Sequence, residues 1–283
     1  MASFTNFATL SYNGGTTNSN IVTGEILEAL TAVKTAVSAN YSAGDRITYA
    51  LSLVNTGTAA VTDYTVTDNL GGYTAGANTV YPLAYNTGTV RYYINGVLQT
   101  APTVTAGPPL TVTGLTIPAG GSAVLIYETT ATPVAPLATG SSITNTATIT
   151  GGGLTNPITA QATVETATSA DLTISKALSP TTVTENGQIT YTFVISNTGN
   201  TEATATGNVV VTDTFAPILR NIAVTYNGTA WTEGTNYTYN AATGVFTTLA
   251  GQITVPAATF TQNTDGTFTV TPGTATLVIT GTV

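Results

Sequence analysis

The chain has 283 residues, of which 42% are apolar and 6% charged, a composition that suits one large or two ordinary globular domains. Its 13 acidic residues outnumber its 5 basic ones, and the resulting negative surface argues against nucleic acid as a partner. It has no cysteine and no histidine, which excludes disulfides, thiolate zinc sites and Ser-His or Cys-His catalysis.

No apolar run reaches the length of a membrane span, and no basic residue precedes Lys34, so we expect neither membrane insertion nor an N-terminal signal peptide. The acidic residues show no pairing of the kind that hydrolyses glycosides. Asp45, Asp63 and Asp68 lack the loop signature of a calcium site. We therefore expect no turnover enzyme, no cofactor and no metal.

In chain order, the predicted elements are short strands separated by Gly, Asn and Pro clusters. Only residues 25–33 near the N-terminus fit a helix, and a repeat described below favours a strand there. The following runs alternate β-branched or aromatic residues with polar ones, and Asn-Gly pairs predict type I′ hairpin turns. These runs and turns are residues 47–54, Asn95-Gly96, residues 122–128, residues 188–195 and Asn227-Gly228. The pattern predicts an all-β protein built as a β-sandwich.

An internal repeat predicts two tandem copies of this domain. GDRITYALSLVNTG at residues 44–57 matches NGQITYTFVISNTG at residues 186–199, at an offset of 142. Three further segments agree, namely 30–34 with 172–176, 64–68 with 209–213, and 121–131 with 273–283. We expect the first domain at 27–168 and the second at 169–283.

The second copy lacks the final hairpin of the first. The first copy continues through a predicted hairpin, residues 142–165, whereas the second stops at Val283. The segment that resembles this hairpin lies at the N-terminus, where SFTNFATL at residues 3–10 matches SITNTATI at residues 142–149. We therefore expect residues 1–26 to complete the second domain of an identical neighbouring subunit. Such a contact is head-to-tail and builds an open filament.

Polar residues recur on the inward faces of the predicted strands. Phe4, Asn6, Ala8 and Leu10 share one face of the N-terminal strand, as do Ile143, Asn145, Ala147 and Ile149 of its counterpart. The same period of two directs both lysines of the chain, Lys34 and Lys176, and the aspartates Asp68 and Asp213 toward the core. An inward Lys, Asn and Asp is the set of groups that a spontaneous isopeptide bond needs.

We expect a Lys34–Asn145 bond within the first domain, with Asp68 as the catalytic acid. Between subunits, the corresponding bond joins Lys176 to Asn6 of the next chain, assisted by Asp213. A buried Lys–Asp ion pair capped by Asn is the alternative. Glu128 is a weaker candidate for catalyst, because the second copy has Thr280 in its place.

Three runs resemble the bacterial surface "conserved repeat" β-sandwich domains, a family of unknown function. They are LTISKALSPTTVTENGQITYTFVISNTGN, VVVTDTF and ITNTATITGG, and the resemblance extends over residues 30–170 and 171–283. It implies tandem immunoglobulin-like modules of a cell-surface or appendage protein, and some related sandwiches carry Lys–Asn isopeptide bonds. In size and organisation the chain is also similar to the ribbon-like appendage proteins of clostridial spores.

The sequence therefore predicts an extracellular structural subunit that polymerises with identical chains on a cell or spore surface. The alternative is a monomeric adhesin or carbohydrate-binding module that uses exposed aromatic side chains. The candidates for that role are Tyr92, Tyr93, Trp231 and Tyr237.

Overall fold

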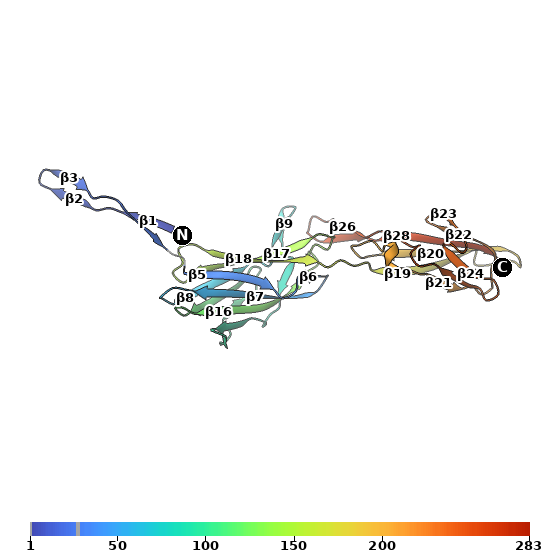
Figure 1. The fold of residues 1–283 in the computed structure, drawn as a ribbon, viewed down its shortest axis with the longest axis horizontal. Helices are drawn as coiled ribbons and strands as arrows, with labels where there is room; N and C mark the ends of the chain where they lie inside the picture. Colours follow the sequence, from blue (N-terminus) through green and yellow to red (C-terminus); the bar gives the residue numbers. More distant parts are fainter. Residues whose placement is uncertain (1, 27–28) are drawn as a thin grey trace. The chain divides into compact units, whose positions relative to one another are not determined.

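A computed structural model describes residues 2–26 and 29–283, and nearly all of their regular structure is β-strand. The described residues contain no α-helix, only the short 3-10 turn η1 (Ala205–Gly207). The chain forms two compact units. The first unit comprises residues up to Tyr73 with Tyr81–Thr132 and Ile143–Val164, and the second comprises Thr74–Val80, Pro133–Ser142 and Glu165–Val283. The prediction of an all-β protein with tandem β-sandwiches is confirmed (Figure 1).

The N-terminal ribbon, residues 2–26, consists of two short antiparallel ladders in succession. In the described part of the chain its strands pair only with each other. The pairs are β1 (Ala2–Asn6) with β4 (Val22–Ile26) and β2 (Thr9–Tyr12) with β3 (Gly15–Asn18). The ladders are interrupted at Phe7 and Ala8, where the Ala8 amide donates to the Ser19 hydroxyl (2.9 Å). The matching strand of the first unit has no such interruption.

Two antiparallel sheets build the sandwich of the first unit. One has the order β13 (Val97–Leu98), β12 (Arg91–Ile94), β16 (Ser122–Ala131), β7 (Arg46–Asn55), β5 (Leu30–Ala36), with β11 (Leu83–Tyr85) also on β16. The other has the order β14 (Thr103–Thr105), β15 (Leu110–Ile117), β8 (Val61–Asp68), β17 (Ser142–Gly151), β18 (Ile158–Thr166), β6 (Asn40–Tyr41). Strict alternation of buried and half-exposed residues along β7 and β16 places their apolar side chains in the core between the sheets.

The second unit repeats the first of these sheets and only part of the other. Its large sheet has the order β19 (Leu172–Ser179), β20 (Gln188–Asn197), β28 (Gly273–Thr282), β22 (Arg220–Tyr226), β23 (Thr229–Trp231). Its small sheet is β21 (Thr212–Thr214), β25 (Val245–Thr248), β24 (Tyr237–Asn240). The remaining pairs are β26 (Thr259–Gln262) with β27 (Phe268–Thr271) and β9 (Tyr73–Ala75) with β10 (Asn78–Val80).

Equivalent buried polar groups relate the two units residue by residue. The Asn55 side-chain amide donates to the carbonyls of Ala59 (2.9 Å) and Pro118 (3.0 Å). Asn197, 142 residues later, donates in the same way to Thr201 (2.8 Å) and Pro256 (3.0 Å). These matched anchors make the internal repeat structural as well as sequential.

Candidate functional site

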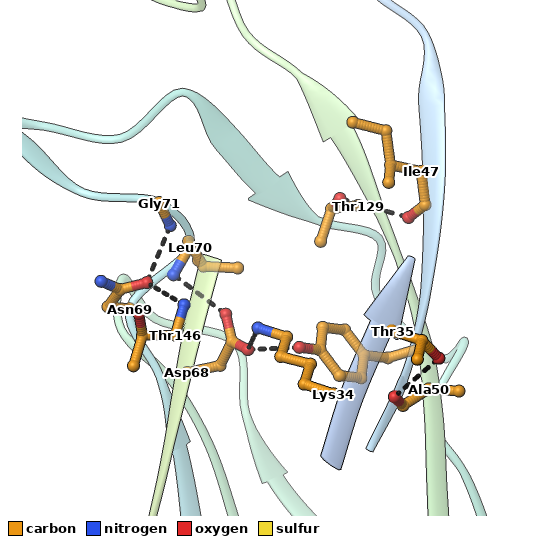
Figure 2. A network of polar contacts seen from close by, with 11 residues as sticks. Lys34, Thr35, Ile47, Ala50, Asp68, Asn69, Leu70, Gly71, Thr129 and Thr146 are labelled. Carbon is orange, nitrogen blue, oxygen red and sulfur yellow. Dashed lines mark hydrogen bonds and ion pairs between the residues drawn. The ribbon is translucent and has the colours of Figure 1, made fainter. Parts of the chain in front are cut away.

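Lys34 lies in the core of the first unit. It is on β5, on the same face as buried Leu30, and its side chain is 0% exposed. The ammonium nitrogen lies 4.8 Å from the centre of the Tyr49 ring and 5.8 Å from that of Tyr127. Its Nζ donates to Oδ2 of Asp68 (2.5 Å), and the two side chains point toward each other in Figure 2. Burying a charge of this kind is costly unless it is paired, and here the pair is complete.

Asp68 ends β8 and receives three hydrogen-bond donors. Oδ2 accepts from Lys34 Nζ and from the Tyr127 hydroxyl, and Oδ1 accepts from the Leu70 amide (2.9 Å). Figure 2 shows Asp68 between Lys34 and Leu70. The carboxylate is therefore held in one orientation, with one oxygen directed at the lysine amine. Glu128, the other acid considered from sequence, is half-exposed and faces Arg46 (3.7 Å), on the opposite side of β16 from Tyr127.

Asn145 is fully buried on β17. Two residues further along the same strand, Ala147 lies opposite Asp68. Neither its Oδ1 nor its Nδ2 has a hydrogen-bond partner within the described chain, and the same holds for the hydroxyl of Tyr49. Each unpartnered buried polar atom costs about 1–3 kcal/mol. Three of them gathered beside a buried Lys–Asp pair are unusual for a purely structural core.

Burial is the main influence on the titration of these groups. Desolvation lowers the pKa of Lys34 from 10.5 to about 8, although Asp68 opposes the shift. Desolvation also raises the pKa of Tyr49 and Tyr127, Asp68 raises it further, and the nearby amide of Asn145 lowers it. The site therefore favours an amine that loses its proton readily and phenols that keep theirs.

A pH profile of stability tests the altered lysine. In an Asn145→Ala variant, whose amine stays free, Lys34 binds fewer protons in the folded state than in the unfolded state between about pH 8 and 10.5. The free energy of unfolding is expected to rise with pH across that window, by up to about 3 kcal/mol, and to change little through this group below pH 8. Urea unfolding between pH 7 and 10 measures this rise. The control Lys34→Met/Asn145→Ala removes it, and an equal rise in the control would contradict the assignment.

The second unit contains the same lysine and aspartate in an open setting. Lys176 Nζ is 2.5 Å from Oδ2 of Asp213 and lies 4.4 Å from the centre of the Tyr191 ring. Its side chain, however, is 40% exposed, whereas that of Lys34 is 0% exposed. The sequence predicted an inward lysine, and the structure places it on that face without a cover.

The two units differ in the strands that flank this position. In the first unit β8 pairs with β15 on one side and β17 on the other, whereas its counterpart β21 pairs only with β25 among the described strands. Val209 is half-buried and Val211 is buried, and strand β21 begins one residue later, at Thr212. Apolar side chains of β19 on the same face as Lys176 are exposed here, Ile174 at 55% and Leu178 at 39%. We call this surface, between β19 and β21, the open edge.

The predicted donor residues lie on the N-terminal ribbon and face solvent. Phe4 is 53% and Leu10 63% exposed, and Asn6 and Ala8 are exposed as well. Their exposure leaves these side chains available to a neighbouring subunit, and the role of donor strand stays a prediction. The four aromatic residues considered for an adhesin differ in setting, since Tyr92 and Tyr237 are buried and Tyr93 and Trp231 are half-buried.

Sequence reasoning missed the tyrosines of the site. Tyr49 and Tyr127 are directly opposite each other on β7 and β16, and their rings stack with centres 5.8 Å apart. The available signal was the alternation of buried residues that puts each tyrosine on the inward face of its strand.

No family model matches the chain. No curated protein matches it either. Among solved structures it is similar to BcpA, the major pilin subunit of Bacillus cereus, at 15% identity and a TM-score of 0.36, covering 96% of this chain and 73% of that one. It is also similar to RrgB, the pilus backbone of Streptococcus pneumoniae, at 14% identity and a TM-score of 0.36, covering 86% of this chain and 55% of that one.

A third similar structure is the N-terminal domain of the Streptococcus gordonii adhesin Sgo0707, at 16% identity and a TM-score of 0.35. The match covers 47% of this chain and 31% of that one. At these TM-scores the similarity conveys no residue roles. The described part of the chain has no helix with the length and apolar character that a membrane crossing requires. Its described acidic side chains form no group of three that could hold a metal ion.

Proposed function

We propose that the chain is a structural subunit of an extracellular fibre on a bacterial cell or spore surface, which assembles head-to-tail by donor-strand complementation. The N-terminal ribbon of one subunit adds to the open edge of the next. The observation that carries this proposal is the contrast between β8, covered by β17, and β21, whose matching side has no strand among the described residues. An unpaired edge beside exposed apolar side chains is a site for strand addition.

The first unit supplies the register of the added strand. There Ala147, Thr148 and Ile149 of β17 lie opposite Asp68, Thr67 and Val66 of β8. Replacing each residue by its counterpart sets Ala8 opposite Asp213, Thr9 opposite Thr212 and Leu10 opposite Val211. Asn6 then takes the place that Asn145 has in the first unit, close to Lys176.

Both non-covalent contacts and a covalent bond hold the added strand. Burying Phe4, Ala8 and Leu10 contributes about 4–8 kcal/mol, whereas association costs about 4–15 kcal/mol. The ladder hydrogen bonds and the second strand of the ribbon add to the favourable side. A covalent bond makes the joint permanent.

The bond forms between the lysine amine and the asparagine carboxamide. Nζ attacks Cγ, the new C–N bond replaces the bond to the amide nitrogen, and ammonia leaves with the proton that the aspartate carries across. Within a subunit the partners are Lys34 and Asn145 with Asp68. Between subunits they are Lys176 and Asn6 with Asp213. The Lys176 side chain is 40% exposed, and in this scheme the docked ribbon covers it.

Engineered cysteines test the proposed register, and the natural chain has no cysteine to interfere. A Thr9→Cys chain mixed with a Thr212→Cys chain is expected to give disulfide-linked dimers under mild oxidation, because directly opposite residues lie within bridging distance. The matched control is Thr9→Cys with Val210→Cys, two residues out of register, which is expected to stay largely unlinked. Equal yields of dimer from both mixtures on a non-reducing gel would contradict the register.

A further inference from the structure

The unpartnered atoms in the core of the first unit point to an additional role. The Tyr49 hydroxyl and both amide atoms of Asn145 are buried without hydrogen bonds, while the Tyr127 hydroxyl donates to Asp68. Both phenols lie close enough to Asn145 to interact with its amide. Among the described residues, the Tyr49 hydroxyl is a free donor and the Asn145 Oδ1 is a free acceptor. This arrangement suits a reaction in which Oδ1 gains negative charge.

We infer that the hydroxyl of Tyr49 is the oxyanion donor of the Lys34–Asn145 reaction and that Tyr127 positions Asp68. This inference rests on the proposed cross-link. When Nζ attacks Cγ, the C=O π electrons move onto Oδ1, and a hydrogen bond aimed at that oxygen stabilises the intermediate more than the starting amide. Apart from the amide nitrogen of Asn145 itself, the Tyr49 hydroxyl is the donor at this site that has no hydrogen-bond partner among the described residues.

The product satisfies the groups that are unpartnered before the reaction. As the intermediate collapses, the C=O bond re-forms and ammonia departs. The new carbonyl oxygen then accepts from Tyr49, and the new amide N–H donates to Asp68 in place of the ammonium. Burial raises the pKa of both phenols, so they remain hydrogen-bond donors and do not transfer their own protons.

The second unit retains only one of the two phenols. Tyr191 corresponds to Tyr49, and its neighbour on β28 is Ile279, at the position that Tyr127 has on β16. Asp213 therefore lacks the side-chain donor that fixes Asp68. The two sites share the oxyanion donor and differ in how firmly the acid is held.

Cell-free synthesis of the full chain, sampled over time by intact-mass analysis, tests this inference. A Lys176→Met background restricts the chemistry to the first unit, where each bond lowers the mass by about 17 Da as ammonia leaves. Tyr49→Phe is expected to slow the loss of mass by about 100-fold without preventing folding, as judged by circular dichroism. The matched control is Tyr64→Phe, which removes another buried phenol of the same unit, one that is hydrogen-bonded to Tyr92. This variant is expected to react at the parental rate.

Two results would overturn the inference and separate it from the proposed function. If Tyr49→Phe loses mass as fast as the parent, Tyr49 is not the oxyanion donor and the cross-link itself stands. If the parent keeps its full mass, as Lys34→Met must, no cross-link forms in the first unit, and both the inference and the proposed Lys34–Asn145 bond fail, whereas head-to-tail strand addition stands and is tested separately by the deletion of residues 2–24. In the otherwise natural chain, Ile279→Tyr is expected to speed the bond between subunits, and an unchanged rate would contradict the role assigned to Tyr127.

Discussion

Deletion of residues 2–24 is expected to abolish assembly and leave a folded monomer. The strands of the N-terminal ribbon pair only with each other among the described residues, so their loss removes no strand from either sandwich. The wild-type chain is expected to give filaments in electron micrographs and a ladder of multimers that survives boiling on a denaturing gel. The deleted chain is expected to give neither filaments nor multimers, because no subunit then has an N-terminal ribbon that can add to the open edge of another.

Asn6→Ala is the matched control, because it removes the carboxamide and leaves the apolar face of the ribbon. Its filaments are expected to form and then to dissociate on boiling, since strand addition continues without the covalent bond. Continued polymerisation of the deleted chain would show that the ribbon is not the donor. Boiling-resistant multimers of Asn6→Ala would show that another group forms the bond.

Lys34→Met is expected to lower the free energy of unfolding of the first unit by at least 3–5 kcal/mol, since it leaves the buried Asp68 carboxylate without a counter-charge. Loss of a cross-link over the loop from residue 34 to residue 145 would add about 4–5 kcal/mol. Guanidinium unfolding of the full chain, with the transition of each unit followed separately, measures the total.

The double variant Lys34→Met/Asp68→Leu distinguishes the cross-link from a simple ion pair. Replacing both charges by apolar groups relieves the unpaired carboxylate, so an ion pair alone predicts recovery to wild-type stability or above. A cross-link predicts that the double variant remains about 4–5 kcal/mol below the wild type. Full recovery, together with an unmodified intact mass of the wild-type protein, would establish the ion pair in place of the bond.

The fold could be predicted from the sequence because its strands alternate strictly and its turns carry Asn-Gly. Asn95-Gly96 and Asn227-Gly228 both have positive φ at each residue, as type I′ turns require. Residues 25–33 are strand at 25–26 and 30–33 as the repeat indicated, and residues 27 and 28 lie outside those described. The interruption at Phe7 and Ala8 was not predicted, because it depends on the Ser19 hydroxyl across the ribbon.

For the site, a period of two was sufficient to direct Lys34, Asp68 and Asn145 to one interior. It could not reveal the phenols around them, because their positions follow from the pairing of β7 with β16. Nor could it foresee that Lys176 is partly exposed, since alternation predicts which face a side chain takes and not whether another strand covers that face.

The pairing of β17 with β8 also limits the architecture of the proposed fibre. Because the first unit fills its own groove with its own hairpin, it offers incoming ribbons no point of attachment there. In the proposed assembly each subunit then has two attachment points, its own N-terminal ribbon and its own open edge. A fibre of such subunits grows without branching. Its length then depends on the supply of subunits and on what binds the open edge of the last subunit.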